Sequence, residues 1–383
     1  MASENILEVR NLSVDYASET GTVHAVDDIS FTVKRGEIFG LAGESGSGKS
    51  TVAFALARLL KFPAKITNGE IVFNLQLERE TPQEETMFGD SVDILDLTAE
   101  ELQQFRWRKL SIVFQSAMNA LNPVLNIYTQ IADVIKAHDP SMSSSQVHER
   151  AKELIRLVGI SPDRLSSYPH QLSGGMRQRA IIAIALALNP ELIIMDEPTT
   201  ALDVVVQREI LNEIKQLQAK FGFSVIFITH DLSLLLEMAD EIAVMYAGRI
   251  VEQATREALY ARASHPYTLG LMHSFPALRG PRRSLTGIPG APPDLRHVPS
   301  GCAFNPRCAY AFAPCTTVLP LLRVPEGEGK RHTVACHLYD ATLNPNGLPE
   351  QIQQLRDESA LQSKSQGQQF EPPVSATMEA RHD

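Results

Sequence analysis

The residues that most constrain how this 383-residue chain can fold form a glycine-rich segment, GESGSGKST, between an apolar run and a helical pattern. Gly43 to Ser50 has the spacing G-x-x-x-x-G-K-S. The preceding EIFGLAG suits a short buried strand, and the following TVAFALARLL has the periodicity of a helix. A strand, a loop and a helix in this order place main-chain N–H groups around the phosphates of a nucleotide. The sequence therefore predicts an α/β fold that binds a nucleotide at this loop.

Two side chains of the loop have the chemistry that a nucleotide triphosphate requires. The Lys49 ammonium would supply a positive charge to the β- and γ-phosphates, and the Ser50 hydroxyl would hold Mg²⁺. We assign ATP binding to the whole loop, which comprises Gly43, Glu44, Ser45, Gly46, Ser47, Gly48, Lys49, Ser50 and Thr51.

A second phosphate-binding element is predicted at LSGGMRQR, residues 172–179. Ser173 is a good N-cap residue, and Gly174 and Gly175 have no side chains, so the helix that follows can bring its first N–H groups against a phosphate. This helix is expected to end at Asn189-Pro190. One phosphate loop and one separate phosphate-facing helix end in the same chain suggest a nucleotide shared between two chains.

Two further apolar runs end in polar residues. ELIIMDEP suits a buried strand that ends in Asp196 and Glu197, whose side chains would point to opposite sides and could serve two roles. The alternative for this pair is a solvated acidic turn. SVIFITHD carries His230 at the end of another β-branched run. A lone histidine at such a place is more often structural than functional.

With these motifs in this order, the chain resembles the ATPase subunit of an ATP-binding cassette transporter from about Ile6 to Glu252. The resemblance implies that Asp196 binds Mg²⁺ through water, that Glu197 polarises the attacking water, and that His230 senses the γ-phosphate. It also implies a P-loop NTPase cassette, which has a RecA-like α/β core, an antiparallel β subdomain and a helical insert.

Three more positions match that family. Gln115 ends the run SIVFQ and corresponds to the glutamine that contacts Mg²⁺ and water and links to the membrane subunits. Tyr16 ends LEVRNLSVDY and fits the aromatic residue that stacks on adenine, although an isolated tyrosine would indicate edge packing. Asp203 in TTALD matches the loop that touches the opposite subunit.

Composition and pattern divide the chain into regions. Residues 1–255 are expected to form the ATP-binding domain, with the helical insert at about 116–188 and a solvated surface loop at 76–90. Residues 256–340 are rich in proline and arginine and are expected to form a small irregular domain. Residues 341–383, with repeated Gln, Ser, Glu and Pro, predict a disordered tail.

The region after residue 255 resembles the extension of oligopeptide and dipeptide permease ATPases. The match lies in HPYT at 265–268, in Pro289-Gly290 and Pro292-Pro293, and in the cysteine-bearing segment that follows. YPHQLSGGMRQR and GESGSGKS resemble the first of the two unequal ATPases of these systems. The implied partners are a second ATPase subunit, two transmembrane permease subunits and a solute-binding protein. Peptides are the expected cargo, while nickel and sugars remain open.

All four cysteines, Cys302, Cys308, Cys315 and Cys336, lie in this extension. A reducing cytosol disfavours disulfides, and the spacing C-x5-C-x6-C-x20-C differs from the close pairs of a zinc finger. Some members of this permease class are thought to hold a four-iron cluster, so the resemblance implies an iron–sulfur site. Zinc and unliganded thiols are the alternatives. We expect such a cluster to order the extension without touching ATP chemistry.

Charge and hydropathy limit the partners and the location. The formal net charge of −10 argues against a nucleic-acid surface, because phosphate backbones are bound by clustered Lys and Arg. The sequence has neither an apolar run of the roughly 18 to 20 residues that cross a bilayer nor a signal-peptide core. We therefore expect a protein on the cytoplasmic side of the cell membrane, bound there through its partners.

Two rival classes share some of these motifs. A soluble cassette ATPase of DNA repair or translation control would typically carry two cassettes in one chain or a long coiled-coil insert, and neither is found in the sequence. A phosphate-loop kinase or GTPase would lack both the Ser-Gly-Gly helix and the strand-end histidine.

Overall fold

The computed structural model describes residues 4–75, 89–114, 120–200, 202–273 and 287–357. Among these residues the larger sheet has seven strands in the order β11-β10-β9-β3-β8-β7-β6. Its strands are β3 (Ile38–Ala42), β6 (Leu110–Val113), β7 (Leu192–Asp196), β8 (Ser224–Thr229), β9 (Glu241–Tyr246), β10 (Arg249–Thr255) and β11 (Thr333–Val334).

The centre of this sheet is parallel: β3 pairs with β8 and β9, and β7 pairs with β6 and β8. Every residue of β3, β7, β8 and β9 is buried. Continuous apolar runs of this kind form the middle of a sheet that is covered on both faces. Because the strands are parallel, their carboxyl ends, which carry the predicted nucleotide residues, lie along one edge.

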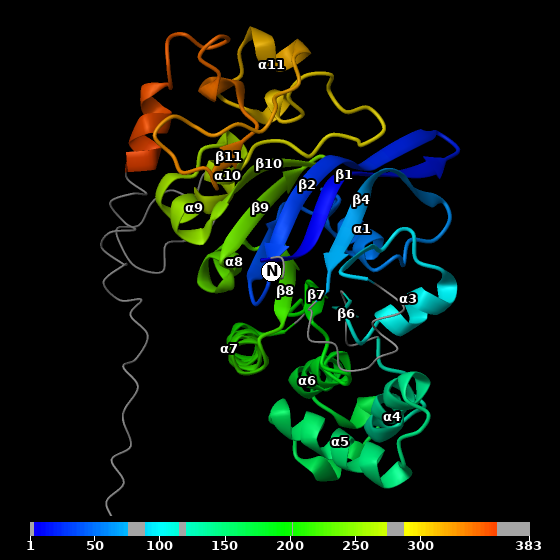
Figure 1. Ribbon diagram of the computed structural model, residues 1–383. Coiled ribbons are helices and arrows are strands. Elements are labelled where there is room, and N and C mark those ends of the chain that lie inside the picture. The colour runs from blue at the N-terminus through cyan, green and yellow to red at the C-terminus, as the bar shows by residue number, and fades with distance from the viewer. Residues whose placement is uncertain (1–3, 76–88, 115–119, 201, 274–286, 358–383) are drawn as a thin grey trace, which may run out of the picture.

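The smaller sheet is antiparallel, with the order β2-β1-β4-β5. It consists of β1 (Asn5–Ser18), β2 (Gly21–Lys34), β4 (Ala64–Asn74) and β5 (Ser91–Asp93). In Figure 1 it lies beside the larger sheet, with α1 (Lys49–Leu56) near it. Leu7, Val9, Phe31 and Phe73 of this sheet share one apolar cluster with Phe39 and Leu41 of β3 and with α1. This cluster holds the phosphate loop between the two sheets.

Helices are inserted between β6 and β7. In α5, the residues Val147, Ala151, Leu154 and Ile155 recur at helical spacing and are buried, and Ser143 and Gln146 form a capping box at its start. The insert lies at the far end of the molecule from the extension (Figure 1). It contains α4 (Ile127–His138), α5 (Ser144–Leu157), η2 (Pro162–Ser166), η3 (Pro169–Gln171) and α6 (Gly174–Ala185).

The remaining helices lie around the sheets or in the extension. They include α3 (Ala99–Phe105), α7 (Val204–Phe221), α8 (Leu232–Met238), α9 (Arg256–Arg262), α10 (Pro266–His273), η4 (Asn305–Arg307), α11 (Ala313–Thr317) and η5 (His337–Tyr339). Within the described ranges, none of the helices has the length and hydropathy needed to cross a bilayer. The predicted fold class, an α/β cassette with an antiparallel subdomain and a small carboxy-terminal region, is confirmed.

The extension is joined to the larger sheet. β11 pairs with β10 in antiparallel register, with Val334 opposite Glu252, and the Ala335 N–H donates to the Val251 carbonyl. This hydrogen bonding continues the core sheet into the extension, which covers the upper end of the molecule in Figure 1.

The predicted tail begins later than the sequence suggested. Residues 341–349 form turns and residues 350–357 are helical, and Ile352 is fully buried in an apolar cluster with Val334 and Leu338. The prediction of disorder is therefore wrong for residues 341–357, because the buried Ile352 and the partly buried Leu348 anchor a segment that is otherwise rich in polar residues. Residues 358–383, and 76–88 of the predicted surface loop, lie outside the described residues.

Candidate nucleotide site

The phosphate loop connects β3 to α1 and is closely packed on one side. Gly43 and Gly48 have φ angles of 150° and 103°, which residues with a side chain rarely adopt. A Cβ on Gly43 would lie 2.3 Å from the Met245 carbonyl oxygen, and one on Gly48 would lie 2.2 Å from that of Ala25. At Gly46 a Cβ would have no neighbour within 4 Å. The loop therefore packs against β9 and β2 and is open at Gly46.

Lys49 begins α1 and is 5% exposed. Its ammonium donates to the carbonyls of Gly43 and Glu44, each at 2.8 Å. Burial lowers the pKa of Lys49, and the nearby carboxylates of Glu197 and Asp196 oppose that shift. Lys49 thus places a positive charge inside the phosphate loop. Its ammonium is held by main-chain oxygens that a phosphate can replace.

Asp196 ends β7 and is 2% exposed. Burial raises the pKa of its carboxyl group, and a hydrogen bond from the Ser50 side chain partly opposes this. Its Oδ1 atom is buried and has no hydrogen-bond partner among the described residues. An orphaned buried carboxylate oxygen is costly unless it receives a ligand, and Mg²⁺ prefers oxygen ligands. Ser50 and Asp196 therefore fit a Mg²⁺ site.

Glu197 leaves the strand in a strained conformation. Its φ angle is 47°, and its N–H donates to the Ile228 carbonyl of β8 at 2.9 Å. The carboxylate accepts hydrogen bonds from Thr200 Oγ1 at 2.9 Å and from His230 Nδ1 at 3.1 Å. Burial would raise the pKa of Glu197, but these two hydrogen bonds outweigh it and lower the pKa. A positioned, charged carboxylate of this kind can accept a proton from water.

The Ser-Gly-Gly segment begins α6 as the sequence suggested. Ser173 is the N-cap, and its hydroxyl accepts the Met176 N–H at 3.3 Å. A Cβ on Gly175 would lie 2.8 Å from a methyl group of Val206, so the absence of a side chain also allows α6 to pack on α7. In the described part of the chain, no hydrogen bond or ion pair joins residues 173–175 to residues 43–51.

Of the three remaining predicted positions, the structure describes Tyr16 and Asp203 but not Gln115. Tyr16 lies in β1, and its hydroxyl is 3.3 Å from Thr51 Oγ1, which places the ring beside the first turn of α1. Asp203 caps α7 by accepting the N–H groups of Val205 and Val206. Gln115 lies outside the described residues, so its assigned role stays a prediction.

Sequence reasoning missed two residues that contact the phosphate loop. The Glu44 N–H donates to the Tyr267 hydroxyl at 2.8 Å. The Glu44 carboxylate accepts from the Arg307 guanidinium at 2.6 and 3.0 Å. The extension therefore contacts the phosphate loop directly. The expectation that a cluster on the cysteines does not touch ATP chemistry concerns other residues and stays a prediction. Tyr267 belongs to the HPYT motif, whose position against the loop could not be read from its spacing.

Comparison with known proteins agrees with this geometry. Residues 26–200 match the ABC transporter family, and residues 251–315 match the carboxy-terminal region of oligopeptide/dipeptide transporters. The probable peptide ABC transporter ATP-binding protein of Sinorhizobium fredii is 41% identical over 344 residues, covering 88% of this chain and 96% of that protein. The chain belongs to the ABC transporter family, in its oligopeptide/dipeptide group.

Two further similarities support the assignment of this chain to the ABC transporter family. The dipeptide transport ATP-binding protein of Bacillus subtilis is 41% identical over 341 residues, covering 88% of this chain and 96% of its own. A dimeric ATP-binding cassette solved in a post-hydrolysis state with ADP and phosphate superposes with a TM-score of 0.55 at 27% identity. That superposition covers 65% of this chain and 98% of the solved one.

The four cysteines of this ABC ATPase are free thiols that converge in the extension. Burial raises the pKa of Cys302 to about 11, and Cys315 and Cys308 add to the rise. Burial also raises the pKa of Cys336, with contributions from the other three sulfurs. Over the described ranges, however, no three His, Cys, Asp or Glu side chains meet the geometry of a metal-ion site. The predicted iron–sulfur cluster is thus not supported by a formed metal site.

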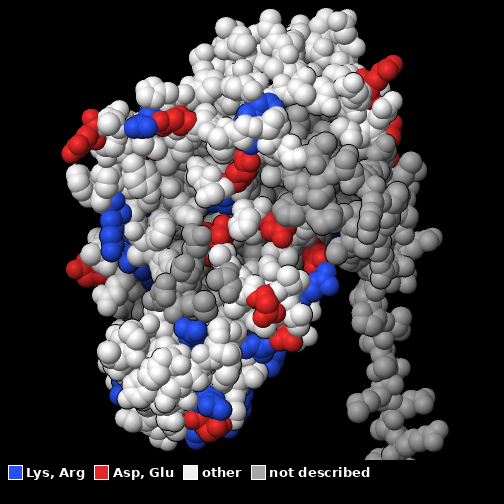
Figure 2. Space-filling model, turned by 180° about the vertical axis from the view of Figure 1, so that it is seen from behind, with Lys and Arg blue, Asp and Glu red and all other residues white. Residues whose placement is uncertain are grey.

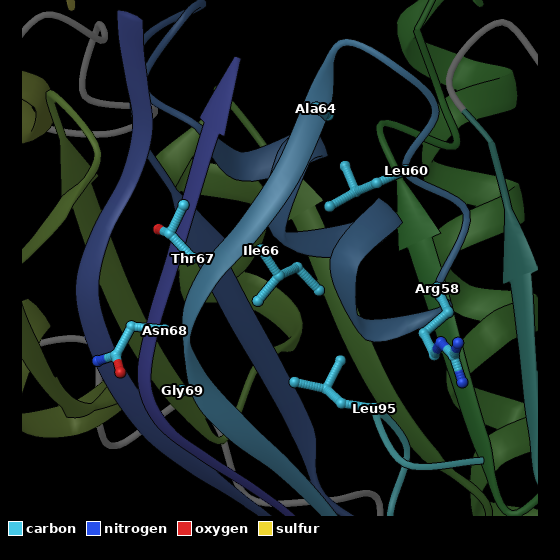
Figure 3. A pocket seen from close by; sticks show the side chains of 8 residues that line it. All are labelled: Arg58, Leu60, Ala64, Ile66, Thr67, Asn68, Gly69 and Leu95. Atoms are coloured by element: carbon cyan, nitrogen blue, oxygen red, sulfur yellow. The ribbon is translucent and has the colours of Figure 1, made fainter. Parts of the chain in front are cut away.

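A hollow of about 520 Å³ lies along β4 (Figure 3). Arg58 also lines the hollow. Its Nη1 atom donates to the carbonyls of Ile94 and Leu97 and so already has partners within the protein. No residue assigned to ATP or Mg²⁺ lines this hollow. It is lined by Arg58, Leu60, Ala64, Ile66, Thr67, Asn68, Gly69 and Leu95.

Charge on the surface is mixed over the cassette. Figure 2 shows acidic and basic side chains interspersed across one face, while the uppermost part, formed by the extension, is mostly uncharged in that view. Exposed apolar residues also occur in the extension, with Leu321 65% and Val324 44% exposed.

Proposed function

We propose that this chain hydrolyses ATP to drive a binding-protein-dependent importer of dipeptides or oligopeptides. The observation that carries the hydrolytic part is the Glu197 carboxylate, which His230 and Thr200 orient beside the Mg²⁺-fitting Asp196. The names of the relatives in Sinorhizobium and Bacillus support peptides as the cargo. Importers of nickel or sugars in the same class are the alternative.

Each residue has a defined task in this proposal. Lys49 attracts the phosphates, and the loop is open at Gly46, where a phosphate can approach its main chain. Ser50 and Asp196 would hold Mg²⁺, which neutralises charge on the phosphates when it is bound. Glu197 accepts a proton from the attacking water while His230 keeps its carboxylate in place. Tyr16, at the rim of the loop, would stack on adenine.

The proposed working unit is a head-to-tail dimer with a second, unequal ATPase subunit. Ser173, Gly174 and Gly175 present helix N–H groups that are not joined to the phosphate loop of their own chain, so a partner's nucleotide is a suitable ligand. Asp203 lies at the exposed start of α7, where it could meet the partner. ATP binding would close the dimer, and hydrolysis would reopen it. The similar cassette solved as a dimer supports this arrangement.

Coupling to two permease subunits is proposed at the start of the helical insert. Val124, three residues after the buried Leu121, is 75% exposed, which gives this segment an apolar residue for a cytoplasmic permease helix. Gln115 would link that surface to the nucleotide. The chain would then lie on the cytoplasmic side of the membrane, bound to its permease, and an extracytoplasmic binding protein would deliver the solute.

An iron–sulfur cluster on Cys302, Cys308, Cys315 and Cys336 remains part of the proposal, with zinc as the alternative. The support is that the other sulfurs lie close enough to affect two of the thiols: Cys308 and Cys315 help to raise the pKa of Cys302, and all three others help to raise that of Cys336. Main-chain N–H groups also donate to three of the sulfurs, as is common around thiolate-held clusters.

The transport assignment can be tested on the complex from native membranes. The chain would be tagged at its amino terminus, purified in mild detergent and reconstituted into vesicles. We expect two multi-spanning subunits and a second cassette to copurify, and dipeptide-loaded binding protein to stimulate ATP hydrolysis. Stimulation by nickel or an oligosaccharide instead would select the alternative cargo. Recovery of the chain only from the soluble fraction, without membrane subunits, would favour an ATPase that is not coupled to transport.

A further inference from the structure

Glu44 of the phosphate loop is held at three points. Its carbonyl accepts from the Lys49 ammonium and its N–H donates to the Tyr267 hydroxyl, both at 2.8 Å. Its carboxylate accepts two hydrogen bonds from Arg307, at 2.6 and 3.0 Å. Tyr267 and Arg307 lie 223 and 263 residues further along the chain, in the extension. The extension therefore fixes both the main chain and the side chain of one loop residue.

The Arg307 guanidinium is fixed before it reaches Glu44. Its Nε donates to the Pro289 carbonyl at 2.7 Å, and Nη1 donates to the Tyr246 hydroxyl at 3.3 Å. The guanidinium carbon also lies 5.7 Å from the centre of the Tyr246 ring and 5.9 Å from that of Phe304. The Arg307 side chain is 6% exposed and that of Glu44 is 27% exposed. A guanidinium group held in this way can bind a carboxylate through both terminal nitrogens and loses little conformational entropy when it does so.

This pair has an electrostatic consequence for the neighbouring phosphate cradle. Glu44 is the only acidic residue of the loop sequence GESGSGKST. An uncompensated carboxylate there would repel the negative charges of ATP, and a partly buried site screens such repulsion less than water does. Arg307 neutralises this charge and directs the carboxylate toward the extension.

We propose that Arg307 is a positioning residue through which the extension sets the affinity of the phosphate loop for ATP. It acts through Glu44 and does not itself touch the nucleotide. The inference rests on the proposed ATP site and deepens it. The competing explanation is that the pair only attaches the extension to the cassette, in which case its loss would change stability but not the ATP affinity of the folded protein.

The test compares R307Q, E44Q and the double variant in the full-length protein within its complex. The probe is a fluorescent ATP analogue with Mg²⁺, and the Km and kcat of ATP hydrolysis are measured beside its Kd. R307Q should weaken binding on the order of tenfold, because it removes a two-pronged charged hydrogen bond and leaves a carboxylate beside the phosphates. Km should rise in parallel, while kcat should change little. Adding E44Q to R307Q should restore most of the lost affinity, because the repelling charge is then gone.

R323Q is the matched control. Arg323 also lies in the extension and pairs with a carboxylate, that of Asp340 at 2.7 Å, but it does not contact the phosphate loop. We expect R323Q to leave the Kd for the ATP analogue unchanged. If R307Q does not fold, R307K and R307K/E44Q replace it, because lysine keeps the charge without the fork and should give a smaller loss with the same rescue.

The outcomes separate the two levels of the proposal. Failure of the unmodified protein to bind the ATP analogue would contradict the proposed ATP site itself. Normal binding by the unmodified protein together with an unchanged Kd in folded R307Q would overturn only the role of Arg307. Weakened binding that E44Q does not relieve would show that repulsion by Glu44 is not the cause, and would also overturn the inference.

Discussion

His230 Nδ1 lies 3.1 Å from the Glu197 carboxylate, although 33 residues separate them in the sequence. The contact follows from the pairing of β7 with β8, in which Asp196 lies opposite Ile228, so both strands end at the same edge. The Glu197 side chain is 12% exposed, whereas that of His230 is 58% exposed. The histidine can therefore meet a nucleotide while it holds a nearly buried base.

Glu197→Gln should leave ATP binding intact and nearly abolish hydrolysis. Glutamine can still accept the hydrogen bond from Thr200, but it cannot accept a proton from water, and loss of a positioned base costs on the order of 10² to 10⁴ in rate. Steady-state hydrolysis and binding of a fluorescent ATP analogue would be measured together. Glu149→Gln, which removes an exposed carboxylate paired with Lys152, is the control. Hydrolysis above about a tenth of the normal rate would exclude Glu197 as the base.

Lys49→Ala should weaken nucleotide binding rather than the chemical step alone. The variant removes the buried ammonium that the carbonyls of Gly43 and Glu44 hold in the cradle, and with it a charged contact that contributes at least about tenfold in affinity. Titration with the fluorescent analogue gives the Kd. Lys152→Ala, at a partly exposed position on α5, should leave the Kd unchanged. Equal affinities of the unmodified protein and Lys49→Ala would contradict the assigned role of the lysine.

Ser173→Arg should damage the ATP site whose phosphate loop belongs to the partner subunit. A long charged side chain at the N-cap removes the hydroxyl that accepts the Met176 N–H and occupies the space in front of α6. In the reconstituted heterodimer, hydrolysis should fall while the isolated variant still binds ATP at its own loop. The idea fails if copies of this chain alone support full transport, or if Ser173→Arg abolishes nucleotide binding by the isolated subunit.

Cys336→Ser should lower iron content and loosen residues 290–340. Cys336 is buried, and the other three sulfurs lie close enough to help raise its pKa. Its loss would therefore remove one ligand of the proposed cluster. Iron and sulfide would be assayed in anaerobically purified protein, and hydrogen exchange would report the order of the extension. Ser300→Ala, an exposed change in the same segment, is the control. Unmodified protein without iron and sulfide would exclude the cluster, and stoichiometric zinc would select the alternative metal.

The buried His332 should make the attachment of the extension dependent on pH. Burial lowers the pKa of His332, but the hydrogen bond and charge of Glu252, followed by Glu328, outweigh it and raise the pKa above the usual value. A raised pKa stabilises the folded form fully below about pH 6.5, and this contribution is lost as pH rises through the folded pKa. Arg356 and Arg262, which pair with Glu328, are the other charges at this site.

The measurement is the melting temperature of the unmodified protein and of His332→Gln between pH 5.5 and 8.5. The unmodified protein should lose stability toward high pH by more than the variant does. His297→Gln, at an exposed position of the extension, should keep the normal slope. Parallel curves for the unmodified protein and His332→Gln would show that this histidine does not provide the dependence.

The fold class could be predicted because its signals are local. The glycine spacing of 43–50, the apolar runs that became β3, β7 and β8, and the Ser173 cap each depend on neighbouring residues. The tail boundary was misplaced because the burial of Ile352 depends on contacts with Val334 and Leu338, which the composition of its own segment does not reveal.

The sequence by itself determined which residues can bind phosphate, hold Mg²⁺ and accept a proton, because those capacities depend on side-chain chemistry and short spacings. Tertiary structure decided which of these residues meet. The parallel pairing of β7 and β8 brings His230 to Glu197, and the extension, joined to β10, carries Arg307 to Glu44. A contact across 263 residues depends on packing of the whole chain, whose free energy is spread over many apolar contacts and leaves no local pattern to read.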